Sequence, residues 1–370
     1  MRKTYLDNIR WITVVLVVIY HVFYMYNAEG VLGGLGQITD LNVQYYDLYM
    51  YIIYPWMMPL LYIVSGISSR LYLEKHTERE FIRSRTTKLL VPSTIGLLCF
   101  QFIQGYISMS LGDAFNTFGQ VPGPVLYMIM VFSGIGVLWY MQLLWVFSLL
   151  LVLFRRMGKD RLRAAGRKTN TLVLVLLAVP VWAAAQILNT PVIVVYRFGL
   201  YGLVFFLGYI IFSHDEVISL LQKRFVPFLA AALVLCVLFC KEYFGSNFAD
   251  APVNRTALFT GYCWFACLAI LGGMAKYGDF STPFTNWMNK RSFGLYLFHY
   301  LGISGVALIV SRRMRTQGLS SLPPLTALAV YLLSLAAGFA VGYLLNAVIP
   351  RIPFFRWAVM GIKKKGVKNV

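Results

Sequence analysis

The sequence predicts an all-α integral membrane protein, a bundle of about ten transmembrane helices. Three observations lead to this fold class. Of the 370 residues, 59% are hydrophobic and 13% are charged, whereas soluble domains are nearer half apolar and a quarter charged. The apolar residues form runs of roughly 20, the length that crosses a bilayer as a helix. The runs do not alternate apolar and polar residues, so a β-barrel does not fit.

About ten segments have the length and composition of a membrane span. In chain order they are 9–27, 46–69, 89–111, 130–154, 171–189, 192–212, 225–243, 256–275, 292–311 and 324–349. The connections between them are short, so we expect a single membrane-embedded domain over residues 1–370. The last segment carries Gly338 and Gly342 at a spacing that favours close helix packing.

The Lys and Arg residues are distributed unevenly between the two sides of this bundle. Of 33 basic residues, 27 fall in segments on the side of the N-terminus and 5 on the opposite side. Cytoplasmic loops carry such an excess, so both termini are predicted to be cytoplasmic. For localisation we expect a multi-pass protein of a bacterial plasma membrane. The net charge of +19 then reflects topology and contact with anionic membrane lipids, and not a nucleic-acid partner.

Ionisable residues inside or at the ends of spans are candidates for function, because burying them in a bilayer is costly. They are Asp7, Arg10, His21, Asp47, Arg85, Arg197 and His299. The four His and five Cys of the chain form no pattern typical of a metal site, so no metal is expected.

Arg10 and His21 are eleven residues apart in the first predicted span. A helix returns to within about 20° after eleven residues and rises roughly 16–17 Å, so both side chains leave one face. Asp7 precedes Arg10 by three residues, a spacing that suits an ion pair. The pattern fits a ligand whose anionic head binds at the inner surface and whose reactive end reaches the histidine. An anchoring arginine and a packed histidine fit it equally.

A basic group precedes the third span. Arg83, Arg85 and Lys88 lie where this span begins, at the end of the predicted inner connection 70–88. Such a group can bind phosphates, and ordinary positive charge on the cytoplasmic side is the alternative.

Six motifs, taken together and in order, resemble those of acyltransferase family 3, whose members are multi-pass membrane O-acyltransferases. Lys88 replaces the second arginine of the family's R-x-x-R-L-x-x-P motif. Lysine keeps the positive charge, but it lacks the guanidinium that binds a phosphate through two parallel hydrogen bonds. The motifs are Y-L-D-N-I-R at 5–10 with His21 after ten further residues, M-P-L-L-Y-I-V-S-G at 58–66, R-T-T-K-L-L-V-P at 85–92, L-W-Y-M-Q-L-L at 138–144, F-F-L-G-Y at 205–209 and S-F-G-L-Y-L-F-H at 292–299.

The resemblance implies transfer of an acyl group, often acetyl, from cytoplasmic acyl-CoA to a hydroxyl at the outer face. The acceptor would be a cell-surface glycan or a lipid-linked sugar. The family's functional positions correspond to His21 as catalytic residue and to Arg10, Arg85 and Lys88 as ligands of acyl-CoA, with Arg83 extending the basic group.

For His21 two roles are open, general base or transient acyl acceptor. Asp47 or a tyrosine such as Tyr24 is expected to fix its tautomer. Asp7, Asp47, Arg197 and His299 are candidates for the ligand tunnel or the acceptor site. For Arg197 a side chain reaching to the outer surface is the alternative, and for His299 a packing role.

Two other classes of function fit the same composition. One is a transporter or flippase for a lipid-linked sugar or small solute, and the other is a sensor or assembly protein with an inactive acyltransferase fold. Neither depends on acyl-CoA or on His21. Homo-oligomers are compatible with all three.

Overall fold

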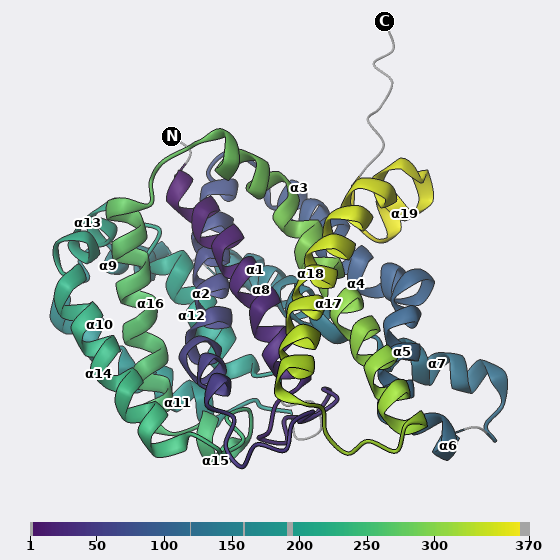
Figure 1. The fold of residues 1–370 in the computed structure, drawn as a ribbon. Coiled ribbons are helices and arrows are strands. Elements are labelled where there is room, and N and C mark those ends of the chain that lie inside the picture. Colours follow the sequence, from purple (N-terminus) through teal and green to yellow (C-terminus); the bar gives the residue numbers. More distant parts are fainter. Residues whose placement is uncertain (1–2, 119, 158–159, 191–194, 363–370) are drawn as a thin grey trace, which may run out of the picture. The chain divides into compact units, whose positions relative to one another are not determined.

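The computed structural model describes residues 3–118, 120–157, 160–190 and 195–362 (Figure 1). Helices account for all regular structure in these ranges apart from one isolated β-bridge between Asn189 and Arg197. The predicted all-α class is therefore confirmed.

Eight helical segments among the described residues are long and apolar enough to cross a membrane. Up to nine result if Phe198–Ile210 and Asp215–Lys223, bent by 105°, count as one broken span. The cytoplasmic location of the termini stays a prediction, which a reporter fused to the C-terminus checks. The eight segments are Thr4–Met25, Tyr45–Leu73, Glu78–Leu111, Gly136–Arg156, Phe225–Tyr243, Ala257–Tyr277, Pro283–Thr316 and Pro324–Arg351.

Three of the predicted spans differ from the helices observed. Segment 171–189 is a shorter apolar helix, Thr171–Gln186, composed of α10 (Thr171–Leu176) and α11 (Ala178–Gln186). Segment 192–212 becomes helical only at Phe198, the start of α12 (Phe198–Ile210), and 191–194 lie outside the described residues. Segment 130–154 divides at Gly134 and Gly136, because α7 (Gly123–Ser133) ends there and α8 (Trp139–Arg156) follows.

The chain forms two compact units. The first comprises residues 1–20, 45–81 and 146–290, and the second comprises 21–44, 82–145 and 291–370. Four of the five divisions fall inside helices, which therefore contribute to both units: α1 (Thr4–Met25), α3 (Glu78–Arg85), α8 and α17 (Pro283–Thr316).

The first unit is built around the crossing of α2 (Leu48–Leu73) and α12. Gly66 of α2 lies against the backbone of Phe205, and Gly208 of α12 lies against the backbone of Ile63, so a side chain at either glycine would meet a carbonyl oxygen. Small residues let membrane helices approach this closely. The motifs M-P-L-L-Y-I-V-S-G at 58–66 and F-F-L-G-Y at 205–209 thus have a packing role.

The remaining helices of the first unit surround this crossing. Trp264 donates its indole N–H to the Leu174 carbonyl at 2.8 Å, and Asn8 fixes α1 by donating to the carbonyls of Gly278 and Phe280. These helices are α9 (Asp160–Gly166), α10, α11, α13 (Asp215–Lys223), α14 (Phe225–Tyr243), α15 (Ala251–Asn254) and α16 (Ala257–Tyr277).

The second unit contains a span that is interrupted by two π-helical turns. The first turn, η2 (Thr86–Leu90), precedes Pro92, which has no N–H to donate to the preceding helical turn. The hydroxyls of Ser93 and Thr94 donate to the carbonyls of Leu89 and Leu90, four residues earlier. The span continues through α4 (Val91–Gly96), η3 (Leu97–Gln101) and α5 (Phe102–Leu111).

This span begins earlier than expected. The predicted inner connection 70–88 is helical from Glu78, so the basic group Arg83, Arg85 and Lys88 lies on α3 and η2 and not in a loop. Thr77 and Glu80 cap the helix start reciprocally: each donates from its backbone N–H to the other's side chain.

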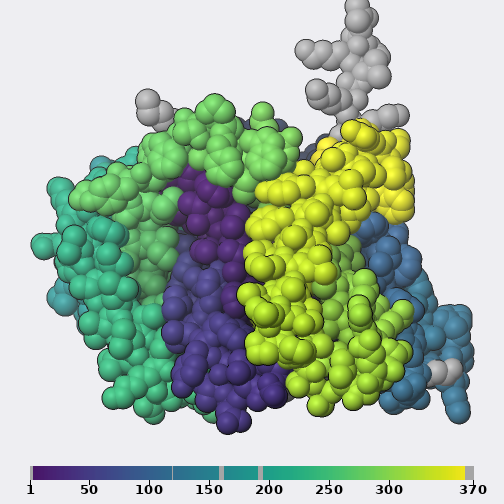
Figure 2. Space-filling view, viewed as in Figure 1, coloured from purple at the N-terminus to yellow at the C-terminus, as the bar shows by residue number. Residues whose placement is uncertain are grey.

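Glycines also fix the close packing of α17 against α18 (Pro324–Val348). Gly302 lies against the backbone of Ala337, Gly338 against Ile303 and Gly342 against Leu295, which confirms the packing role predicted for the last span. Figure 2 shows α18, in yellow, at the surface of the molecule. The exposed residues of this helix include Leu325, Leu328, Leu332, Leu333 and Leu344. The unit is completed by α6 (Ala114–Phe118), α7, η4 (Gly136–Leu138), η5 (Ile349–Arg351) and α19 (Pro353–Ala358).

Candidate active site

Two histidines that are far apart in the sequence form a hydrogen-bonded pair in the second unit. Nε2 of His299, near the middle of α17, lies 3.0 Å from Nδ1 of His21, near the end of α1. His299 is fully buried, whereas His21 is half-buried. The half-buried ring is therefore the one that a substrate can reach.

The partners of His299 define the tautomers of the neutral pair. Its Nδ1 lies 3.0 Å from the Leu295 carbonyl and 2.9 Å from the Tyr296 carbonyl. Carbonyl oxygens only accept, so this Nδ1 carries the proton and Nε2 is the acceptor. The His21 Nδ1 must then donate to it. The proton of neutral His21 is thus on Nδ1, which leaves its Nε2 as the basic nitrogen.

Two tyrosines pack their rings on His21. The Tyr300 ring centroid lies 5.1 Å from that of His21, and the Tyr24 centroid lies 5.8 Å away, both edge to face. Tyr24, expected as a tautomer-fixing residue, donates its hydroxyl proton to the Leu32 carbonyl. The nitrogen whose proton sets the tautomer of His21 pairs with His299, so the expectation that Asp47 or Tyr24 fixes this tautomer is wrong.

The tyrosine hydroxyls bind a glycine loop, defined as residues 30–36. Tyr300 donates its hydroxyl to the Gly33 carbonyl at 3.0 Å, and the backbone N–H of Leu35 donates to Met25 at 2.7 Å. Gly33 has a φ of 102° and lies against the Tyr24 hydroxyl, so a larger residue fits neither the backbone nor the space. The loop is thereby held beside the histidine pair.

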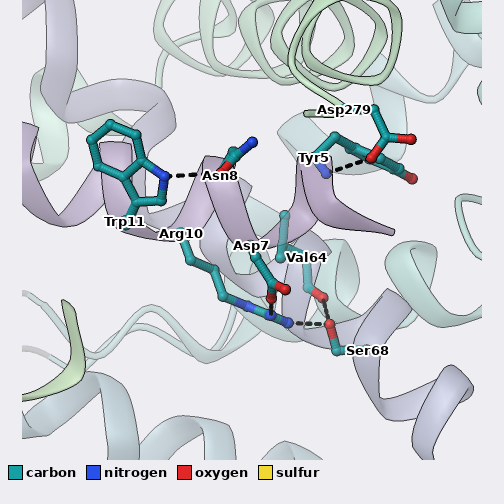
Figure 3. Close-up of polar contacts among 8 residues, drawn as sticks. All are labelled: Tyr5, Asp7, Asn8, Arg10, Trp11, Val64, Ser68 and Asp279. Atoms are coloured by element: carbon teal, nitrogen blue, oxygen red, sulfur yellow. Dashed lines mark hydrogen bonds and ion pairs between the residues drawn. The ribbon is translucent and has the colours of Figure 1, made fainter. Parts of the chain in front are cut away.

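Arg10 forms the predicted ion pair with Asp7, one turn earlier on α1, at 2.8 Å (Figure 3). Its second terminal nitrogen donates to the hydroxyl of Ser68 on α2, and Ser68 donates in turn to the Val64 carbonyl at 2.7 Å. Arg10 therefore connects α1 to α2 within the first unit. Its side chain keeps 37% exposure, so part of the guanidinium remains accessible to a ligand.

The basic group presents its charges at the surface of the second unit. Arg83 and Lys88 are exposed and Arg85 is half-buried. The π-helical turn carries Lys88, and such turns occur frequently at functional sites. The C-terminal segment packs here, because Gly361 lies against the backbone of Thr87 and Lys88.

Arg197 and Asp47 belong to the first unit. Arg197 is 3% exposed and occupies the N-cap of α12, and not the interior of a span as expected. It donates to the Asn254 carbonyl at 2.7 Å and its guanidinium lies 5.3 Å from the Phe259 ring centroid. The alternative of a side chain reaching the outer surface is wrong, because the residue is buried. Asp47 is fully buried directly before α2.

The pairing of His21 with His299, the Tyr300 contact and the glycine loop were not predicted from sequence. Each depends on contact between residues more than 260 positions apart or on the conformation of the connection after α1. The only signals in the sequence were His21 in the predicted span 9–27, His299 in the predicted span 292–311, and a stretch with four glycines.

A family model described as an acyltransferase domain, that of acyltransferase family 3, matches residues 3–347. No curated protein and no solved structure matches the chain significantly. The matched region spans nearly the whole chain and includes both histidines, the basic group and the glycine contacts between helices. The protein is therefore a multi-pass membrane protein that belongs to acyltransferase family 3.

Proposed function

We propose that this protein is a membrane O-acyltransferase. It moves an acyl group, acetyl in the first instance, from cytoplasmic acyl-CoA to a hydroxyl of an extracytoplasmic glycan or lipid-linked sugar. The observation that carries the proposal is the His21–His299 pair, because its hydrogen bonds make Nε2 of His21 a base while His21 stays accessible.

The reaction assigned to this pair is a direct transfer. Nε2 of His21 takes the proton of the acceptor hydroxyl as its oxygen attacks the thioester carbonyl. The tetrahedral intermediate collapses with loss of the CoA thiolate, which receives the proton back from Nε2. While His21 is protonated, its Nδ1–H donates to His299, which spreads the positive charge towards the carbonyls of Leu295 and Tyr296. In the alternative route the same Nε2 attacks the thioester first and the CoA thiolate leaves, which gives an acyl-histidine. The acceptor hydroxyl then takes the acyl group from Nε2, and its proton goes to the CoA thiolate.

The basic group supports binding of acyl-CoA. Arg83, Arg85 and Lys88 offer charge-assisted hydrogen bonds to phosphates from one short helical stretch. Arg10 is a further candidate, since helix geometry places it on the His21 face of α1 roughly 16–17 Å away. Because Asp7 and Ser68 already bind its guanidinium, we expect Arg10 to contribute less than Arg85.

The position of His21 supports an acceptor that arrives from the opposite side. His21 lies four residues before the end of α1, and the glycine loop follows that end. The charge distribution predicts this end to be extracytoplasmic. A glycan or lipid-linked sugar offers hydroxyls there.

The test measures acetyl-CoA turnover by the purified protein in lipid nanodiscs. We expect slow hydrolysis without acceptor, which His21→Ala abolishes and His76→Ala preserves. His76 is the matched control because it is an exposed histidine on the connection after α2. Equal turnover in wild type and His21→Ala would overturn the proposal. No turnover together with transport of a lipid-linked sugar would favour the flippase alternative.

A further inference from the structure

A second group of arginines lies in the first unit, separate in sequence from the basic group on α3 and η2. We call it the arginine cluster. It comes from the last turns of α2 and α8 and from α9, and its members are Arg70, Arg155, Arg156 and Arg163. Arg155 and Arg163 are close enough to Arg70 for their charges to act on it.

The neighbouring elements hold these ends together. His214, at the bend between α12 and α13, contacts the Arg163 carbonyl through Nε2 at 3.0 Å, and Gly166 lies against the carbonyl of Ile210. Asp215, the residue after His214, pairs with Lys3 at 2.5 Å. Lys3 directly precedes α1, so the arginine cluster lies at the N-terminal end of α1. That end is predicted to face the cytoplasm.

The carboxylates around the cluster leave positive charge uncompensated. Glu74 pairs with Arg70 at 2.8 Å. Glu78 is shared between Arg155 at 3.4 Å and Arg156 at 3.1 Å. Among the side chains that the structure describes, no carboxylate pairs with Arg163, and Nη1 of Arg155 is buried without a hydrogen-bond partner. Within the described part of the chain, these four guanidiniums thus share two carboxylates, and an unsatisfied buried N–H favours an anion.

The surface beside the cluster is apolar. Leu150 and Leu153 on α8 are 45% and 56% exposed, and Met157 after the helix is 63% exposed. Their spacing puts these three residues on one face of the helix. Arg156, whose side chain is 68% exposed, lies at the end of this apolar face. A ligand that uses both surfaces has an anionic head and an apolar tail. A soluble anion would use only the arginines.

We propose that the arginine cluster binds the phosphate of an anionic phospholipid, with the lipid's acyl chains on the exposed face of α8. The lipid belongs to the cytoplasmic leaflet, where anionic headgroups attract basic residues. This site shares no residue with the one proposed for acyl-CoA.

The test measures binding of phosphatidylglycerol to the full-length protein by native mass spectrometry, with phosphatidylcholine as the neutral reference. Arg163→Gln is the sharpest variant, because it removes a cation that forms no ion pair among the described side chains. We expect about tenfold weaker retention of phosphatidylglycerol and no change for phosphatidylcholine. Arg167→Gln is the matched control, since Arg167 is bound to Glu216 at 2.6 Å.

A second variant and two competitors complete the test. Arg155→Lys keeps the charge but loses the fork, so we expect intermediate retention. Inorganic phosphate and acetyl-CoA, added separately, should not displace phosphatidylglycerol.

Equal retention of phosphatidylglycerol by wild type and Arg163→Gln would overturn the proposal. Displacement by phosphate would also overturn it, because it would indicate a site for a soluble anion. Loss of acetyl-CoA binding in Arg163→Gln would assign the cluster to acyl-CoA instead. Failure of wild type to bind acetyl-CoA at all would contradict only the proposed function.

Discussion

Nε2 of His299 lies 3.0 Å from Nδ1 of His21, and this one hydrogen bond joins α1 to α17 across 278 positions of sequence. Because neutral His299 directs its single N–H, on Nδ1, to two carbonyls, its Nε2 can only accept from His21. A fully buried imidazole thereby fixes the tautomer of an accessible one. The arrangement resembles metal-binding histidines, whose second nitrogen is oriented by an outer partner.

His21→Gln should separate binding from chemistry. Glutamine keeps the size and a hydrogen bond of the imidazole, but it takes up no proton at neutral pH. We therefore expect near-normal acyl-CoA binding and a loss of transfer of about 10²–10⁴-fold. Calorimetry measures acyl-CoA binding, and an assay with labelled acetyl-CoA measures acyl transfer. A variant that keeps a tenth or more of wild-type transfer would show that His21 is structural.

His299 should act as a positioning residue. His299→Ala leaves the His21 Nδ1–H unsatisfied in a buried place, which costs about 1–3 kcal/mol and roughly five- to a hundredfold in rate. His299→Gln can still accept that hydrogen bond, so it should recover a large part of the rate. Steady-state transfer kinetics on both variants checks this. Equal loss in the two would point to a packing role only.

Arg85→Ala should weaken acyl-CoA binding. Charge-assisted hydrogen bonds contribute about 1.5–3 kcal/mol each, which is roughly ten- to a hundredfold in affinity. Arg312→Ala is the control, since it removes an exposed positive charge from the second unit near the far end of α17. Equilibrium binding of acetyl-CoA to both proteins distinguishes them. If Arg85→Ala binds acetyl-CoA like wild type, the positive charge of the basic group acts only in setting the membrane topology.

Tyr300→Phe should loosen the glycine loop without moving the ring from His21. The lost hydrogen bond to Gly33 contributes about 0.5–1.5 kcal/mol. We expect acetyl-CoA hydrolysis to rise relative to transfer by about two- to tenfold, because the loop then excludes water less well. Tyr331→Phe is the control: its hydroxyl donates to the carbonyl of Tyr26 at 3.4 Å, a residue outside the glycine loop. An unchanged ratio in Tyr300→Phe would mean that the loop does not shield the site.

Gly66→Ala should destabilise the first unit. A methyl group at this position meets the Phe205 carbonyl and the backbone of the Gly208 turn, so α2 and α12 must separate. Overpacking of this kind costs about 1–3 kcal/mol. Gly305→Ala is the control, because it adds the same methyl group to α17 where nothing lies within 4 Å. Thermal unfolding in detergent compares the two, and equal melting temperatures would contradict the close crossing.

The amino-acid sequence by itself determined the class of the fold, most of the spans and the Asp7–Arg10 pair. Hydrophobic length and helical spacing are local properties, so they can be read along the chain. It also placed a histidine in α1 and another in α17. Tertiary structure alone decided that these two meet, that a π-helical turn carries Lys88, and that Tyr300 holds the glycine loop. Pairing depends on which helices pack together, and in a membrane small residues such as Gly66 and Gly302 decide that through contacts distant in sequence.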